Sequence, residues 1–138
     1  MGSAEVILLD THALVWMDQD NPKLGKQARK LIERTFREDK VAVSAISFWE
    51  CAMLVGRNRI SLPSALETWR AELLSNGLAE LPIDGPTAIL AAQLDSDHKD
   101  PADRIIAATA LRHHATLVTA DERLLAGLPG LTSQDARK

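Results

Sequence analysis

Val6-Ile7-Leu8-Leu9-Asp10 is a short apolar run that ends at a carboxylate. Four consecutive apolar residues are typical of a strand that is buried on both faces, as in a parallel sheet. Residues 11–17 fit a helix, so the stretch predicts a buried strand that passes directly into a helix. Asp10 stands at the junction, where it could cap the helix or serve a site at the end of the strand.

The rest of the chain repeats this alternation of strand and helix. Further strands are expected at residues 41–43, 81–83 and 116–119. Asn21-Pro22 is a helix start signal, and the expected helices are residues 23–38, 47–55 (or from 45), 64–75, 86–94, 101–113 and 122–126. This order predicts an α/β fold with a mostly parallel sheet covered on both faces. Because there is no repeat, low-complexity segment or linker, residues 1–138 are expected to form one domain.

Composition narrows the class of protein further. The 138 residues are 46% hydrophobic, enough for one core, and a single cysteine permits no internal disulfide. A net charge of −3 argues against coating nucleic acid by bulk electrostatics, and 4% aromatic residues argue against a base-stacking surface. No apolar run approaches the roughly 20 residues of a membrane span, and residues 1–5 lack signal-peptide features. A cytoplasmic protein is therefore expected.

Four acids lie in apolar settings along the chain: Asp10, Glu50, Asp103 and Asp121. In open α/β sheets, ligands bind outside the carboxyl ends of the strands. Asp10 and Asp121 lie at or just past such ends, and Asp103 lies in the first turn of a helix, so these distant acids can meet in one cleft. Clustered carboxylates bind hard divalent cations such as Mg2+ or Mn2+. The pattern favours a metal-dependent nuclease.

Each acid also has a purely structural interpretation. Asp10 and Asp121 could be helix caps, and Asp103 could belong to a cap formed with Asp100. Glu50 is harder to explain in this way, because an isolated carboxylate in the apolar segment 46–55 costs several kcal/mol of stability. It could still form a capping box with Ser47 or pair with an arginine. Asp84 follows a strand-like run too, and spacing alone does not separate it from the other acids.

Four stretches of the chain, taken together, resemble a known family. Residues 7–16, 44–50, 98–110 and 117–124 are similar, in order, to the acidic motifs of PIN-domain ribonucleases of the VapC toxin type. The resemblance spans the chain from near its start to near its end. It implies a compact three-layer α/β/α sandwich.

The resemblance also implies roles for individual residues. Asp10, Glu50, Asp103 and Asp121 would be the catalytic, metal-binding acids. Asp103 is preferred to Asp100 because it directly precedes the Arg-Ile-Ile-Ala-Ala run. Thr119 and Ser47 would support the site. The family hydrolyses RNA to a 5′-phosphate and a 3′-hydroxyl, usually forms a homodimer and is inhibited by a VapB-like antitoxin, so these partners are expected here.

Several basic and aromatic residues remain open to two interpretations. Lys99 and Arg104 flank the expected site and are candidates for phosphate contact. A basic stripe could follow an RNA backbone or simply be solvated; its members are Lys23, Lys26, Lys30, Arg34 and Arg37. The four histidines lack the spacing of a helical zinc site, and His12 is expected to pack beside the acids. Trp49 is a candidate for a dimer or antitoxin contact.

Two other functions compete with a ribonuclease. A phosphatase or phosphotransferase with an aspartyl nucleophile would also place an aspartate such as Asp10 at a strand end. Haloacid-dehalogenase-like phosphatases, however, carry a second aspartate two positions later, where this chain has His12. A non-catalytic PIN-like scaffold is the other alternative, and the complete set of four acids argues against it.

Overall fold

The central strand β1 (Ile7–Leu9) lies between β2 (Val41–Ser44) and β4 (Thr116–Thr119). The computed structural model describes residues 5–95 and 98–138. Within them, β3 (Ala79–Leu81) and β5 (Thr132–Asp135) complete one sheet in the order β3-β2-β1-β4-β5. Every neighbouring pair of strands is parallel. The predicted mostly parallel sheet is thus confirmed, and in the described residues it is entirely parallel.

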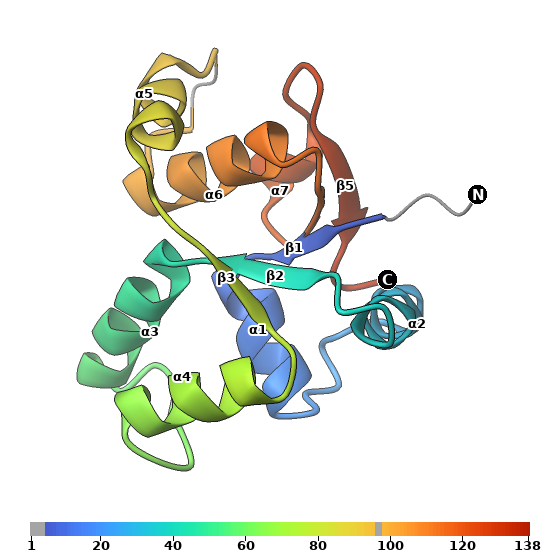
Figure 1. Cartoon of the computed structure of the whole chain (residues 1–138), viewed down its shortest axis with the longest axis vertical. Coiled ribbons are helices and arrows are strands. Elements are labelled where there is room, and N and C mark those ends of the chain that lie inside the picture. Colours follow the sequence, from blue (N-terminus) through green and yellow to red (C-terminus); the bar gives the residue numbers. More distant parts are fainter. Residues whose placement is uncertain (1–4, 96–97) are drawn as a thin grey trace.

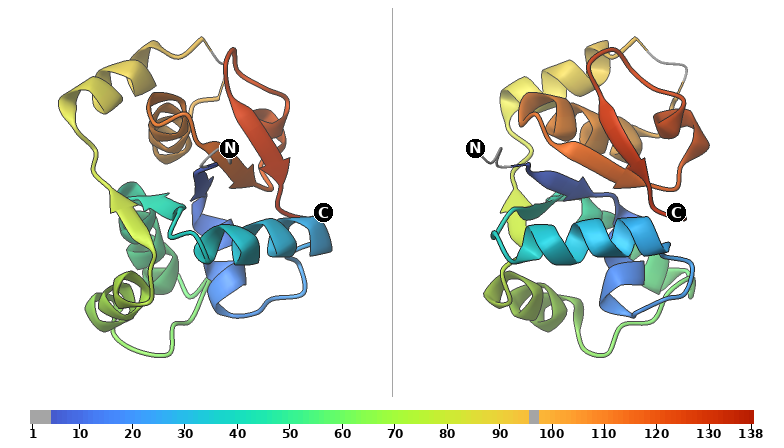
Figure 2. Two further views of the ribbon diagram at one scale, coloured as in Figure 1. Left: turned by 45° about the vertical axis from the view of Figure 1, so that its right-hand side comes forward. Right: turned by 90° about the vertical axis from the view of Figure 1, so that its right-hand side faces the viewer.

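Side chains of β1 alternate between two cores, one on each face of the sheet. Ile7 and Leu9 pack in one core, whereas Leu8 packs in the other. The first core is covered by α1 (Thr11–Asp18), α2 (Lys26–Phe36), α3 (Ile46–Gly56) and α4 (Leu66–Ser75). The opposite face carries α5 (Gly85–Gln93), α6 (Pro101–Arg112) and α7 (Glu122–Leu125), as Figures 1 and 2 show. The α/β/α sandwich is confirmed.

The start of α2 differs from the prediction. Asn21-Pro22 does not begin the helix, because the Asn21 side chain instead accepts a hydrogen bond from the Lys23 amide at 2.9 Å and closes a turn. The helix begins after Gly25, whose amide donates to the carbonyl of Ala136 at 2.8 Å. A Cβ atom at Gly25 would lie 2.2 Å from the backbone of Lys138. A glycine here lets the C-terminal segment meet the free amides of the first helical turn.

Two strand predictions also need correction. β3 spans Ala79–Leu81 and not residues 81–83. β5 was not predicted, since its sequence Thr132-Ser133-Gln134-Asp135 has neither an apolar run nor alternation. It forms as the edge strand beside β4, so its backbone partner and not its side-chain pattern determines it.

The topology brings the ends of β1 and β4 together. From β1 the chain passes to β2 and β3 on one side, and then crosses over to β4 and β5 on the other. The direction of winding therefore reverses between β1 and β4, which is where open parallel sheets bind ligands. In the described part of the chain, no helix combines the length and the hydropathy needed to cross a bilayer.

Candidate active site

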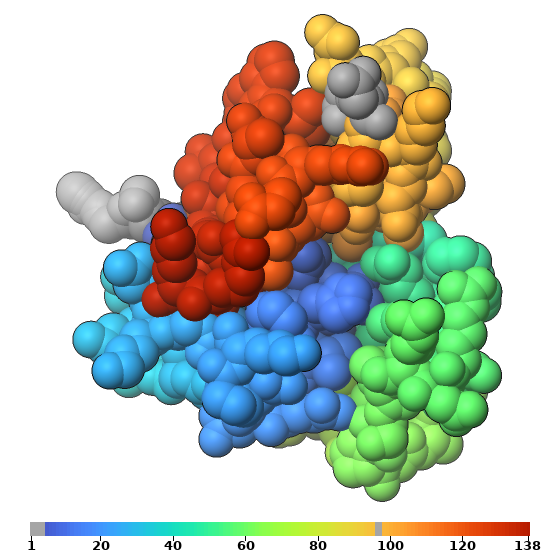
Figure 3. All heavy atoms as spheres, turned by 180° about the vertical axis from the view of Figure 1, so that it is seen from behind, coloured from blue at the N-terminus to red at the C-terminus, as the bar shows by residue number. Residues whose placement is uncertain are grey.

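A pocket of about 360 Å³ opens at this reversal point. Asp10, Glu50, Asp103 and Asp121 all line it, together with Thr11, His12, Trp16, Asp100 and Ala120. These residues come from the ends of β1 and β4, from α1 and α3, and from the start of α6. Figure 3 views the molecule from behind, with α1 in blue between α3 in green and the orange segments that carry Asp103 and Asp121. Acids more than a hundred positions apart in sequence therefore share one pocket.

Asp10 is both a helix cap and a buried site residue. Its Oδ1 accepts the Ala13 amide at 2.8 Å, and its Oδ2 accepts the Thr119 hydroxyl at 2.5 Å. Only 6% of the residue is exposed. Burial raises the pKa of Asp10 above its ordinary value, although the hydrogen bond from Thr119 opposes this shift. The cap interpretation and the site interpretation therefore both apply.

Thr119 links the two strand ends. Its hydroxyl donates to Asp10 and accepts the amide of Asp121 at 3.0 Å. Asp121 in turn caps α7, since its Oδ1 accepts the amides of Arg123 and Leu124 at 2.9 and 3.0 Å. The contact with Asp10 is the kind of hydrogen bond expected of Thr119 as a supporting residue.

Glu50 is held from the neighbouring helix. The Thr11 hydroxyl donates to Glu50 Oε1 and lies 3.0 Å from the buried hydroxyl of Ser47. The alternative capping box between Ser47 and Glu50 does not form, because Ser47 lies inside α3, whose N-cap is Ala45. Burial raises the pKa of Glu50, and the nearby Asp100 carboxylate adds to the rise.

Asp103 lies close to three other acids of the pocket. Oxygens of Asp103, Asp100 and Glu50 lie within 4.8 Å of one another. Burial, followed by repulsion from Asp100, Glu50 and Asp121, raises the pKa of Asp103 to about 7. Asp100 is also the N-cap of α6 and accepts the amides of Ala102 and Asp103. The sequence reasoning preferred Asp103 to Asp100 as the site acid, whereas both residues line the pocket.

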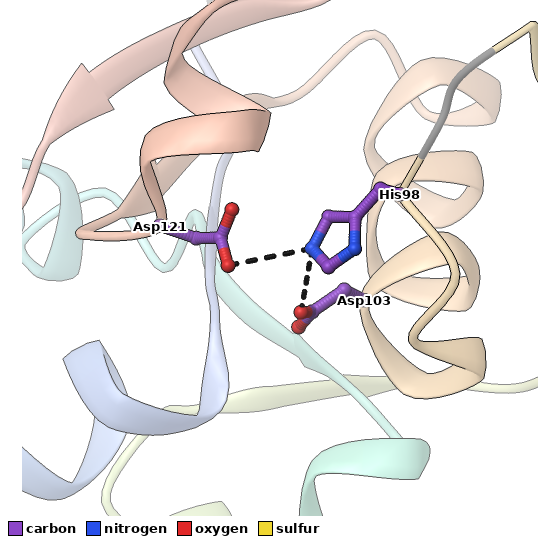
Figure 4. Close-up of side chains that lie close together, drawn as sticks. All are labelled: His98, Asp103 and Asp121. Carbon is purple, nitrogen blue, oxygen red and sulfur yellow. Dashed lines mark ion pairs between the residues drawn. The ribbon is translucent and has the colours of Figure 1, made fainter.

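His98 is a second residue that sequence reasoning missed. It is buried, and its Nε2 lies 2.9 Å from Asp103 Oδ2 and 3.3 Å from Asp121 Oδ2 (Figure 4). Its position five residues before Asp103, in the third motif, was the available signal. His12 was placed correctly beside the acids but is exposed, with its ring 6.4 Å from that of Trp16.

The charge of the pocket favours a bound cation. Among the described residues, no lysine or arginine forms an ion pair with the acids that line it. The pairing of Glu50 with an arginine is thus not found. Three of these carboxyls have raised pKa values, so their charged forms lack compensation. A divalent cation with hard oxygen ligands fits this set of donors.

Arg104 does not face this pocket. Its guanidinium donates to the backbone carbonyls of Ala91, Ala92, Leu94 and His98 at 2.8–3.3 Å. With Lys99 it lines a separate groove between α5 and α6. Arg104 therefore ties the end of α5 to the segment before α6, and this geometry argues against phosphate contact. Lys99 is exposed, and its contact with phosphate stays a prediction.

The remaining candidates are surface residues. Lys23 precedes α2, so only part of the basic stripe is helical, and its members are exposed. Arg34 pairs with Glu5 at 3.4 Å, as a solvated face would. Trp69 is buried in the core, whereas Trp49 on α3 is 57% exposed. Trp49 borders a second pocket that shares Glu50 and Asp100 with the first.

Comparison with known proteins agrees with this geometry. The sequence model of the PIN domain matches residues 7–127. Ribonuclease VapC22 of Mycobacterium tuberculosis is 37% identical over 119 residues, which cover 86% of this chain and 88% of the relative.

Solved structures share the fold at lower identity. VapBC2 from Rickettsia felis, bound to a DNA fragment from its promoter, gives a TM-score of 0.70 at 18% identity, covering 94% of this chain and 97% of that one. DNA-bound VapBC from Salmonella typhimurium gives 0.69 at 20%, covering 95% and 98%. The chain therefore belongs to the PIN domain family, as a relative of the VapC ribonucleases.

Proposed function

We propose that this protein is a metal-dependent endoribonuclease and the toxin of a VapBC-type pair. One observation carries the proposal: acids from four separate elements line one pocket at the switch point of a parallel sheet. The relative that is 37% identical is named a ribonuclease. The acidic pocket supports a metal-assisted reaction on a phosphodiester, because its carboxylates would otherwise repel the substrate.

Mg2+ or Mn2+ is the cofactor we propose, held by Asp10, Glu50, Asp103 and Asp121. When bound, such an ion polarises a phosphoryl oxygen and lowers the pKa of a coordinated water. The chain contributes the placement of the acids. Thr119 fixes one oxygen of Asp10, and the α7 amides fix one oxygen of Asp121. The carboxylates are therefore oriented before substrate arrives.

Of the four acids, Glu50 is the one we favour for orienting the attacking water in place of direct contact with the metal, and Asp121 is the alternative. Both oxygens of Asp121 have protein contacts, one with α7 amides and the other with His98. Glu50 is held through Oε1 by Thr11, and no hydrogen bond among the described residues involves its Oε2. That oxygen is available to accept a hydrogen bond from water and align it with the leaving oxygen.

The partners we propose are an RNA substrate, a VapB-like antitoxin and a second copy of the chain, all in the cytoplasm. Neighbouring structures include VapBC complexes, which supports the antitoxin. Trp49 and Met53 form an exposed apolar area on α3 beside the pocket. Such aromatic and methionine side chains are enriched in protein interfaces, so this area is our candidate for one of the two protein contacts.

An aspartyl nucleophile at Asp10 has less support. Both Asp10 oxygens accept hydrogen bonds, and the side chain is buried. Attack on phosphorus would require an exposed oxygen with a free approach. The geometry suits a fixed ligand better than a nucleophile.

The proposed reaction is tested with purified protein and structured RNA. We expect cleavage with Mg2+ or Mn2+, none in EDTA, and recovery when metal is restored. Asp103→Asn should abolish cleavage, whereas Asp95→Asn, an exposed aspartate outside the pocket, should cleave as the wild type does. Cleavage that persists in EDTA, or in the Asp103 variant, would contradict the mechanism.

A further inference from the structure

His98 joins two acids that belong to different parts of the fold. Asp103 lies in the first turn of α6, and Asp121 lies between β4 and α7. The same imidazole nitrogen, Nε2, is 2.9 Å from one carboxylate and 3.3 Å from the other. Figure 4 shows the ring beside the two carboxylates, with one nitrogen directed toward both. A single polar atom therefore bridges two groups that would otherwise repel each other.

The bridge contacts the carboxylates from behind the pocket. Asp103 and Asp121 line the pocket, whereas His98 is not among its described lining residues and is only 6% exposed. Both contacts use the Oδ2 atoms. The α7 amides hold Oδ1 of Asp121, so His98 supplies the second constraint that stops this carboxylate from rotating.

His98 is itself anchored by the scaffold. Its backbone carbonyl accepts a hydrogen bond from Arg104 Nη1 at 2.9 Å. The same guanidinium donates from Nε to the Ala91 carbonyl of α5 at 2.9 Å. Arg104 thus holds the backbone at His98 against α5 and α6, which restricts the movement of the imidazole.

We propose that His98 is a positioning residue that holds Asp103 and Asp121 in the arrangement that binds the divalent cation. The inference rests on the proposed function, because it assumes that these acids bind a metal. Residues that hydrogen-bond to metal ligands fix ligand orientation, and losing one typically costs about 10–100-fold in metal affinity. His98 would act through the carboxylates without contacting the metal.

The test measures Mn2+ binding to the full-length protein by calorimetry and by the EPR signal of free Mn2+. We expect His98→Ala to weaken Mn2+ affinity about 10–100-fold. His98→Gln should restore most of it, because its amide nitrogen reaches about as far as imidazole Nε2, whereas the shorter His98→Asn should not. His113→Ala, which removes an exposed histidine at the end of α6, is the matched control and should bind as the wild type does.

Rescue by glutamine separates positioning from general stability. If His98→Ala fails to fold, the difference between the glutamine and asparagine variants decides the question. Equal Mn2+ affinity in the His98 and His113 variants would overturn the role. Pulsed EPR that detects a histidine ¹⁴N bound to Mn2+ in both the wild type and His12→Ala, but not in His98→Gln, would also overturn it, because His98 would then be a direct ligand.

Failure of the proposed function has a different signature. A wild-type protein that binds no Mn2+, or an Asp10→Asn variant that binds it normally, would contradict the metal site and this inference with it. Binding that is lost in Asp10→Asn but unchanged in His98→Ala would retain the metal site and remove His98 from it.

Discussion

Asp10 and Asp84 occupy the same kind of local position in this fold. Each follows a strand of the sheet and caps the next helix by accepting the amide three residues later. The two distances are 2.8 Å to Ala13 and 2.9 Å to Thr87. Their electrostatic settings are opposite. Burial raises the pKa of Asp10, whereas hydrogen bonds from Thr87, with Arg112 nearby, lower the pKa of Asp84 to about 2.

The difference comes from the position of each strand. Asp10 follows the central strand β1, where α1 and β4 exclude water, whereas Asp84 follows the edge strand β3 and is exposed. Asp84 also has a cation, since Arg112 Nη1 lies 3.0 Å from its Oδ1. A carboxylate that is buried without a paired cation carries an uncompensated negative charge, which a bound cation would stabilise. The uncompensated charge, and not the local motif, identifies Asp10 as the acid that can serve a metal site.

The largest expected effect distinguishes these two acids directly. Asp10→Asn should reduce metal-dependent RNA cleavage by about 10³-fold or more. Metal assistance is worth several kcal/mol, and each tenfold in rate corresponds to about 1.4 kcal/mol. Asp84→Asn should leave the rate within about twofold, since it lies outside the pocket. Rates are measured under single-turnover conditions with saturating Mn2+. Equal losses in the two variants would mean that the caps, and not the pocket, determine activity.

The sequence predicted the buried strand that precedes Asp10, but it did not predict why Asp10 and Asp84 differ. The apolar run before Asp10 predicted a buried strand, and the order of elements predicted the sheet and its layers. The spacing around Asp84 looked equivalent, because Arg112 lies 28 positions away and only the packing of α5 against α6 brings it close. The resemblance to four ordered family motifs distinguished Asp10 from Asp84, whereas the local sequence pattern did not.

Thr119→Val should have the next largest effect. It removes the hydrogen bond to buried Asp10 and leaves the Asp121 amide without its acceptor. We expect Mn2+ affinity to fall about 10-fold or more, since this residue orients two of the proposed ligands. Thr116→Val lies at the other end of β4, where its hydroxyl meets Glu5 at 3.1 Å, and is the control. If Thr116→Val weakens Mn2+ binding as much, the effect belongs to the strand and not to the site.

The pH dependence of stability tests whether the buried acids lack a compensating positive charge. A raised carboxyl pKa means that the folded protein holds more protons than the unfolded chain, so stability falls as pH rises. For Asp103 the window runs from its ordinary pKa of 3.8 to about 7. We expect the melting temperature in EDTA to decrease across this window, and less steeply in Asp103→Asn. Added Mn2+ should offset the decrease. A melting temperature that rises through the window in EDTA would show that the buried acids are already compensated.

Other parts of the site could not be read from the sequence, for physical reasons. His98 and Arg104 act through contacts with backbone or side chains whose positions depend on the packing of α5 and α6. Basic residues beside an acidic motif suggested phosphate contact, but Arg104 is used to satisfy carbonyls at the end of α5. β5 has a polar sequence and depends on pairing with β4. In each case the packing of neighbouring elements, and not the local sequence pattern, decides the role.

The smallest expected effect concerns Asp84, the exposed member of the compared pair. Arg112→Ala removes the cation beside Asp84 and its hydrogen bond to Thr87 Oγ1. Exposed ion pairs contribute little to stability, so we expect only a slight fall in the melting temperature and unchanged Mn2+ affinity. Asp84 has access to water and tolerates the loss, whereas buried Asp10 would not tolerate a comparable change. Unfolding of the Arg112 variant at moderate temperature would show that Asp84 is structurally as dependent on its partner as Asp10 is on Thr119.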